Sequence, residues 1–147
     1  MNSPAPQPAP KPLLKPVLKP VLKPGDTFTL EAPKVTRTAL ALYAGASGDH
    51  NPVHIDIDAC RAVGIDDVFA HGMLSMAYLG RLLTDWVPQD RIREYGVRFS
   101  AITPVNTAPV CRGTVTSVED GLARLDLTVS LPDGTVTLQG RATVTTD

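Results

Sequence analysis

The sequence has few cysteines, few aromatic residues and no long apolar run. Its two cysteines, Cys60 and Cys111, form no CxxC or other close pair. We therefore expect neither a disulfide framework nor a cysteine zinc site. No stretch approaches the roughly 20 consecutive apolar residues of a transmembrane helix. These absences predict a cytoplasmic protein without a membrane-spanning segment.

An excess of positive charge is also missing, since the formal net charge is -1. The first 24 residues contain four lysines and no acid (Lys11, Lys15, Lys19 and Lys23), so the remaining residues carry more acids than bases. Such a domain is not expected to bind nucleic acid. A chain of 147 residues is long enough for one domain with a substantial core.

Proline recurs every two to four residues in the first 24. This spacing blocks helices and sheet ladders and favours polyproline II or disorder. The Lys-Pro pairs also interrupt the apolar stretch that a signal peptide needs. We therefore predict a tail over residues 1–24 and a single domain over residues 25–147. The tail is interpreted as a solvated extension, with a docking ligand for a partner as the alternative.

Two ionisable side chains, Asp49 and His54, lie on a loop that cannot be helical. Gly48 suits the left-handed end of a preceding helix, and Pro52 holds Asn51 in an extended conformation. Taken singly, the aspartate is typical of a capping residue and the histidine of a packed core imidazole. Together they form a candidate catalytic pair.

A metal site is not expected at this loop. The break at Pro52 excludes helical i,i+4 spacing between His50 and His54, so the two histidines are not an HxxxH pair. We predict neither a metal nor a cofactor.

Periodicity predicts an α+β fold with one long central helix. From Gly72 to about Thr84 the helix has almost no polar face and is expected to be buried nearly all round. Residues 122–131 and 136–144 alternate apolar and polar side chains, and the turn signals at 119–121 and 132–134 join three successive strands. A further alternating strand contains Tyr95, Val97, Phe99 and Ala101.

Shorter elements are expected before the central helix. Residues 27–30 are a first strand, and a short helix capped by Asp58 runs through Val63 to Gly64. Between them, Thr36 or Thr38 caps a helix whose buried face is predicted to contain Val35, Ala39, Leu42, Tyr43 and Ala46.

Three sequence segments carry a family resemblance. SGDHNPVHID (47–56) and AHGML (70–74) together resemble the hydratase motif of the MaoC-like family, which contains (R)-specific enoyl-thioester hydratases and 3-hydroxyacyl-thioester dehydratases of the hot-dog superfamily. EYGVRFSAITPV (94–105) resembles the strand after the central helix of that family, and the pattern is similar to the catalytic subunit of mycobacterial fatty-acid-elongation dehydratases. The resemblance covers residues 24–145.

The resemblance implies a hot-dog fold, in which an antiparallel sheet wraps a long buried central helix. It also implies reversible hydration of trans-2-enoyl thioesters to (R)-3-hydroxyacyl thioesters, in fatty-acid or polyhydroxyalkanoate-type metabolism. Asp49 and His54 would act as a dyad on one water, and the Gly72 N–H would hold the enolate oxygen. Which dyad member abstracts a proton and which donates one stays open.

Three further residues are candidate substrate-binding positions by resemblance. Asn51 would orient the loop or the water. His71 would fix the helix start through its ring, without a chemical step. Gly80 stands where some relatives carry a small hydroxyl residue facing the acyl chain, so its lack of a side chain removes a possible hydrogen bond.

The resemblance leaves the partner and two other functions open. The substrate is an acyl-coenzyme A or acyl-carrier-protein thioester, because both carriers present the same phosphopantetheine arm. We expect a homodimer, with a heterodimer containing a related hot-dog subunit as the alternative. The other functions are thioester hydrolysis and non-catalytic acyl-thioester binding within such a heterodimer.

Overall fold

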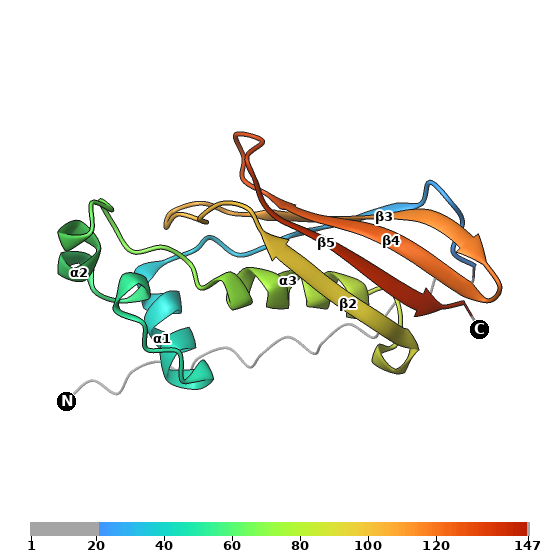
Figure 1. The fold of residues 1–147 in the computed structure, drawn as a ribbon, viewed down its shortest axis with the longest axis horizontal. Coiled ribbons are helices and arrows are strands. Elements are labelled where there is room, and N and C mark those ends of the chain that lie inside the picture. The colour runs from blue at the N-terminus through green and yellow to red at the C-terminus, as the bar shows by residue number, and fades with distance from the viewer. Residues whose placement is uncertain (1–20, 147) are drawn as a thin grey trace, which may run out of the picture.

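The computed structural model describes residues 21–146, which form an antiparallel sheet with one long helix against it (Figure 1). Along the chain the elements are β1 (Thr27–Glu31), α1 (Arg37–Ser47), η1 (Pro52–His54), α2 (Ile57–Ala62), α3 (Gly72–Thr84), η2 (Gln89–Arg91), β2 (Ile92–Phe99), β3 (Val110–Glu119), β4 (Leu122–Ser130) and β5 (Val136–Thr145). The five strands follow the order β1-β3-β4-β5-β2. The predicted α+β class is confirmed.

Hairpins build the centre of the sheet, as predicted. β3, β4 and β5 pair in succession, and the turn residues Asp120, Gly121 and Gly134 adopt the positive φ that such turns require. The predicted inward residues of β4 are buried. Thr137, a polar residue of the alternating pattern predicted for β5, is fully buried, and its hydroxyl donates to the Val129 carbonyl at 3.3 Å.

Helix α3 has the predicted bounds but not the predicted burial. The buried face of the helix consists of Ser75, Leu79, Leu82 and Leu83. Among the strands, α3 makes its main contacts with β1, β2, β3 and β4. The opposite stripe is open, since Met73 is 54% exposed and Ala77 and Arg81 are exposed as well. The expectation of burial nearly all round is therefore wrong for a single chain.

The face of α1 was predicted only in part: Val35 is buried and Ala39 and Tyr43 are half-buried, but Leu42 and Ala46 are exposed. Leu40 and Ala44 are the buried residues, whereas Leu42 is 71% exposed. The helix contains several alanines, so its apolar pattern does not select one stripe. Its ends agree with the prediction, because the Thr36 hydroxyl accepts from Ala39 N and Gly48 has φ 77°.

Two boundaries lie earlier than the sequence suggested. Asp56, rather than Asp58, caps α2, because its carboxylate accepts from the backbone N–H groups of the first helical turn. Leu22, which the predicted tail included, is 6% exposed and belongs to the main core cluster. The Gly25 N–H donates to the Val115 carbonyl nearby. Packing in the described part of the chain therefore begins before residue 25; residues 1–20 of the predicted tail lie outside the described residues.

Candidate active site

The loop after α1 holds Asp49 at the end of the molecule where α1 and α2 gather beside the start of α3 (Figure 1). Its carboxylate accepts from Asn51 N at 3.2 Å, and the Asn51 side chain accepts from Val53 N at 3.3 Å. Each of these hydrogen bonds joins a side chain to the backbone N–H two residues later, and together the two fix the conformation of the loop. Asn51 thus caps η1, in keeping with the expectation that it orients the loop.

His54 ends η1 and is 8% exposed. Its Nδ1 lies 2.8 Å from the Phe69 carbonyl oxygen. A carbonyl only accepts, so Nδ1 carries the hydrogen and, in the neutral ring, Nε2 keeps a lone pair. The Phe69 ring adds an edge contact, with ring centroids 5.0 Å apart. His54 is therefore presented as a proton acceptor at Nε2.

His71 immediately precedes α3 and is fully buried. Its Nε2–H donates to the backbone carbonyl of Asp49 at 3.1 Å, and its ring stacks on His54 with centroids 4.0 Å apart. Tyr43 meets the same ring edge-on at 4.8 Å. His71 Nδ1 is buried without a hydrogen-bond partner among the described residues. The ring thus links the Asp49 loop, His54 and the start of α3.

Burial lowers the pKa of His71 below the ordinary value, against the smaller raising effect of its hydrogen bond to the Asp49 carbonyl. The nearby His54 lowers it further. Because an ordinary imidazole is already mostly neutral at pH 7, this ring is neutral there. A neutral His71 places no repelling charge beside His54.

The potential ligand atoms of Asp49, His54 and His71 lie within 4.8 Å of one another. Two imidazoles and a carboxylate are a donor set that zinc accepts. However, the two histidine rings stack on each other, with centroids 4.0 Å apart and planes 30° from parallel. His71 Nε2 is also already hydrogen-bonded. The cluster fits a hydrogen-bonded acid–base site better than a metal site.

Gly72 begins α3 and lines an apolar pocket of about 370 Å³. A Cβ on Gly72 would lie 2.8 Å from Cε1 of Phe99, so the space beside this glycine is filled by that ring. The resemblance assigns the Gly72 N–H to the enolate oxygen of the substrate, and the structure shows an aromatic side chain beside this residue. Phe99, one of the apolar residues of the predicted alternating strand, is 49% exposed. The pocket is lined by Phe69, Ala70, Gly72, Phe99, Ala101, Ile102, Thr103 and Leu138.

Gly80 lies away from the Asp49–His54 pair. It is eight residues along α3 from Gly72, which corresponds to about 12 Å at 1.5 Å per residue. A Cβ on Gly80 would lie 3.5 Å from the Tyr95 ring, whose hydroxyl donates to the Met76 carbonyl at 2.6 Å. The structure therefore brings Asp49, His54 and His71 together at the helix start but leaves Gly80 beneath Tyr95.

Sequence reasoning missed the residues that support this site. Phe69 holds His54 through its backbone carbonyl, and Tyr43 packs against His71. A backbone contact leaves no trace in residue type. The AHGML segment does place residue 69 near the site, and this position was the available signal.

Residues 20–132 match the family described as MaoC like domain. The chain belongs to this family. It is 31% identical over 115 residues to 3-hydroxyacyl-thioester dehydratase Z of Mycobacterium tuberculosis, covering 74% of each chain. It is 32% identical over 110 residues to 3-hydroxyacyl-thioester dehydratase X of the same species, covering 73% of this chain and 38% of that one. Hydration or dehydration of enoyl or hydroxyacyl thioesters is the reaction class of this lyase family.

Solved structures confirm the hot-dog fold. The (R)-hydratase of A. caviae involved in PHA biosynthesis superposes with TM-score 0.77 and 22% identity, over 84% of this chain and 96% of that one. R-hydratase PhaJ1 from Pseudomonas aeruginosa superposes with a TM-score of 0.76 and 23% identity, over 84% of this chain and 81% of that one. A chain of the ChsH1-ChsH2 complex from Mycobacterium tuberculosis superposes with a TM-score of 0.74 and 23% identity, over 84% of this chain and 97% of that one. That complex contains two different chains. None of the described helices of this protein is long and apolar enough to cross a membrane.

Proposed function

We propose that this protein catalyses the reversible hydration of trans-2-enoyl thioesters to (R)-3-hydroxyacyl thioesters, in fatty-acid or polyhydroxyalkanoate-type metabolism. One observation carries the proposal: the Asp49 carboxylate lies within 4.8 Å of a ring nitrogen of His54 beside the start of α3, and Nδ1 of this ring is already hydrogen-bonded to the Phe69 carbonyl. Family membership gives the reaction class, and the closeness of these two groups supports their assignment as the acid and base that the reaction needs.

The dyad acts on one water. The water oxygen attacks C3 of the enoyl group while one proton passes from the water to the dyad. Nε2 of the neutral His54 ring is the acceptor of this proton. The dyad then returns one proton to C2, so its charge is restored after each turnover. Positioned proton transfer of this kind contributes roughly 10² to 10⁴ in rate.

The start of α3 stabilises the negative charge that develops on the thioester oxygen. The first N–H groups of a helix have no intrahelical acceptor, and the helix dipole favours an anion there. We assign the Gly72 N–H as the donor to this oxygen. In other enzymes, one such donor contributes about 2.7 to 4 kcal/mol. Phe99, which lies over Gly72, must then leave the thioester a path to this N–H.

The active protein is proposed to be a cytoplasmic homodimer that takes its substrate on coenzyme A or acyl carrier protein. The open stripe of α3 contains Met73, and the exposed Phe99 and Ile102 lie near its start. A second chain would cover such apolar surface.

Turnover assays test the proposal directly. Purified full-length protein should hydrate crotonyl, octenoyl and longer enoyl thioesters, each offered on both carriers. Asp49→Asn and His54→Ala should each lower kcat by orders of magnitude, and the double variant should be little worse than either, because the two groups act as one unit. His50→Ala is the matched control, since His50 is an exposed histidine on the same loop.

Two results would redirect the assignment. Release of free thiol from the thioester would indicate hydrolysis. Substrate binding without turnover, together with full binding by both dyad variants, would indicate a non-catalytic subunit.

A further inference from the structure

Arg37 and Asp67 form an ion pair between two segments that each lead to a member of the dyad. The Arg37 guanidinium donates from Nε to one carboxylate oxygen of Asp67 at 3.0 Å and from Nη2 to the other oxygen. A two-point contact of this kind fixes the relative orientation of the two groups as well as their distance. The hydrogen bond from Arg37 is also the main cause that lowers the pKa of the Asp67 carboxyl below its ordinary value.

The Asp67 end of the pair leads to His54. Asp67 lies two residues before Phe69, whose carbonyl orients the His54 ring. Its carboxylate also accepts from the N–H of Val68 at 2.8 Å, which ties the side chain to the backbone of its own segment. The direct backbone hydrogen bond from Phe69 to η1 is long, with 3.4 Å between its nitrogen and the Val53 carbonyl oxygen. The ion pair therefore adds a charge-assisted constraint close to the Phe69 carbonyl.

The Arg37 end of the pair leads to Asp49. Arg37 is the first residue of α1, and the helix ends at Ser47 just before the Asp49 loop. Because each turn of a helix is hydrogen-bonded to the next, a shift of its first residue also moves its last one. One ion pair thus joins the rigid element that carries Asp49 to the segment that orients His54.

Apolar packing holds the same two segments together without fixing their orientation. Leu40 of α1 and Val68 belong to one core cluster. Attraction between such side chains is non-directional, so it tolerates small rotations of one segment against the other. The Arg37 and Asp67 side chains are 55% and 30% exposed, so their pair contributes little to the stability of the fold. Orientation is what a directional pair adds to this packing.

We propose that Arg37 and Asp67 are positioning residues, whose ion pair keeps the Asp49 loop and the Phe69 carbonyl in the relative positions that the dyad needs. Neither side chain transfers a proton; each acts through the segment that carries it. The inference rests on the hydration proposed above. Without the pair, the His54 ring can turn relative to the Asp49 carboxylate, and a displacement of about 1 Å in an active site can lower the rate about 100-fold.

Arg37→Met and Asp67→Asn test the positioning in the full chain. The first removes the guanidinium but keeps an apolar stem, and the second removes the charge but keeps the shape. Each should lower kcat about tenfold or more for the enoyl thioester that wild type hydrates best, while KM changes by less than about twofold. The double variant should be no worse than either single one, because both substitutions remove the same pair. Arg37→Lys keeps the charge and should retain more activity than Arg37→Met.

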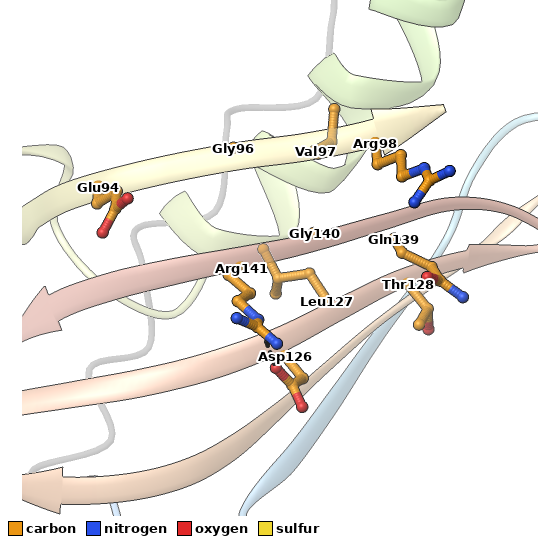
Figure 2. A pocket seen from close by; sticks show the side chains of 10 residues that line it. All are labelled: Glu94, Gly96, Val97, Arg98, Asp126, Leu127, Thr128, Gln139, Gly140 and Arg141. Atoms are coloured by element: carbon orange, nitrogen blue, oxygen red, sulfur yellow. Dashed lines mark ion pairs between the residues drawn. The ribbon is translucent and has the colours of Figure 1, made fainter. Parts of the chain in front are cut away.

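Asp126→Asn is the matched control. Figure 2 shows the ion pair between Asp126 and Arg141, which lie on the neighbouring strands β4 and β5. Both side chains are exposed, and they line a pocket of about 590 Å³ that contains none of the dyad residues. Loss of this pair should leave kcat unchanged. Circular dichroism confirms that each variant is folded.

The tautomer of His54 gives a readout that does not depend on turnover. The Phe69 carbonyl keeps the hydrogen of the neutral ring on Nδ1. ¹⁵N NMR of the ring nitrogens should therefore show the Nδ1–H form in wild type and in Asp126→Asn. Arg37→Met and Asp67→Asn should show a measurable fraction of the Nε2–H form, because the Phe69 carbonyl is no longer held in place. Spectra of His54→Ala identify the signals.

The outcomes separate this inference from the proposed reaction. Unchanged kcat in both single variants, additive losses in the double variant, or a His54 tautomer that stays as in wild type overturns the positioning and leaves hydration standing. A wild type that hydrates no enoyl thioester overturns the hydration, and the tautomer of His54 then still tests the positioning.

Discussion

Protonation of His71 should make the folded protein less stable in mild acid. Burial lowers the pKa of this ring in the folded state, while the unfolded chain has the ordinary value of 6.5. Below that pH the unfolded state binds a proton that the folded state does not, so stability falls as pH falls. For a folded ring that takes up no proton at all, linkage sets an upper limit of about 1.4 kcal/mol on the loss between about pH 7.5 and about pH 5.5.

His71→Gln isolates this effect, because the glutamine amide can still donate to the Asp49 carbonyl but does not titrate. Urea unfolding of both proteins, at fixed protein concentration and ionic strength, should show wild type losing up to about 1.4 kcal/mol more than the variant between these pH values. His50→Gln, which removes an exposed histidine, should behave as wild type. Equal pH dependence in wild type and His71→Gln would refute the account of a buried neutral ring.

Three further outcomes follow from packing. Gly72→Ala should remain folded, because Gly72 lacks a positive φ and the half-exposed Phe99 ring can move. Its kcat/KM for enoyl thioesters should fall at least tenfold, because the added methyl group and the displaced ring crowd the backbone N–H of residue 72. Leu22→Ala should lower the free energy of unfolding by roughly 2–5 kcal/mol. Val21→Ala, at a 63% exposed position, should lower it by less than about 0.5 kcal/mol. Asp67→Asn removes the ion pair between Arg37 and Asp67, which is open to solvent, and should shift the midpoint of the same urea assay only slightly.

The parts of the fold that the sequence predicted well are those specified by a local signal. Gly48 ends α1 in the left-handed conformation, and Gly121 and Gly134 turn the hairpins with positive φ. The predicted start of α3 at Gly72 is also confirmed. In each case one or two adjacent residues determine the backbone conformation, so no distant contact has to be known.

The errors arise where packing against distant segments decides. Leu42 fits an apolar face of α1 as well as Leu40 does, and only the contact with the second core cluster selects Leu40. Thr137 is buried, and a carbonyl on β4 satisfies its hydroxyl there. The open stripe of α3 reflects a surface that a single chain does not cover. Periodicity identifies an apolar face, but not what lies against it.

The site itself depends on backbone atoms that residue types do not reveal. The Phe69 carbonyl orients His54, and the Asp49 carbonyl orients His71, whose ring stacks back on His54. Each of the two segments, the loop that carries the dyad and the residues before α3, therefore accepts a hydrogen bond from a histidine of the other. Because Gly72 directly follows His71, the proposed oxyanion donor is positioned by the same contacts as the dyad. A substitution that loosens this stack should displace the water-binding groups and the oxyanion donor together, and so lower kcat more than it weakens substrate binding.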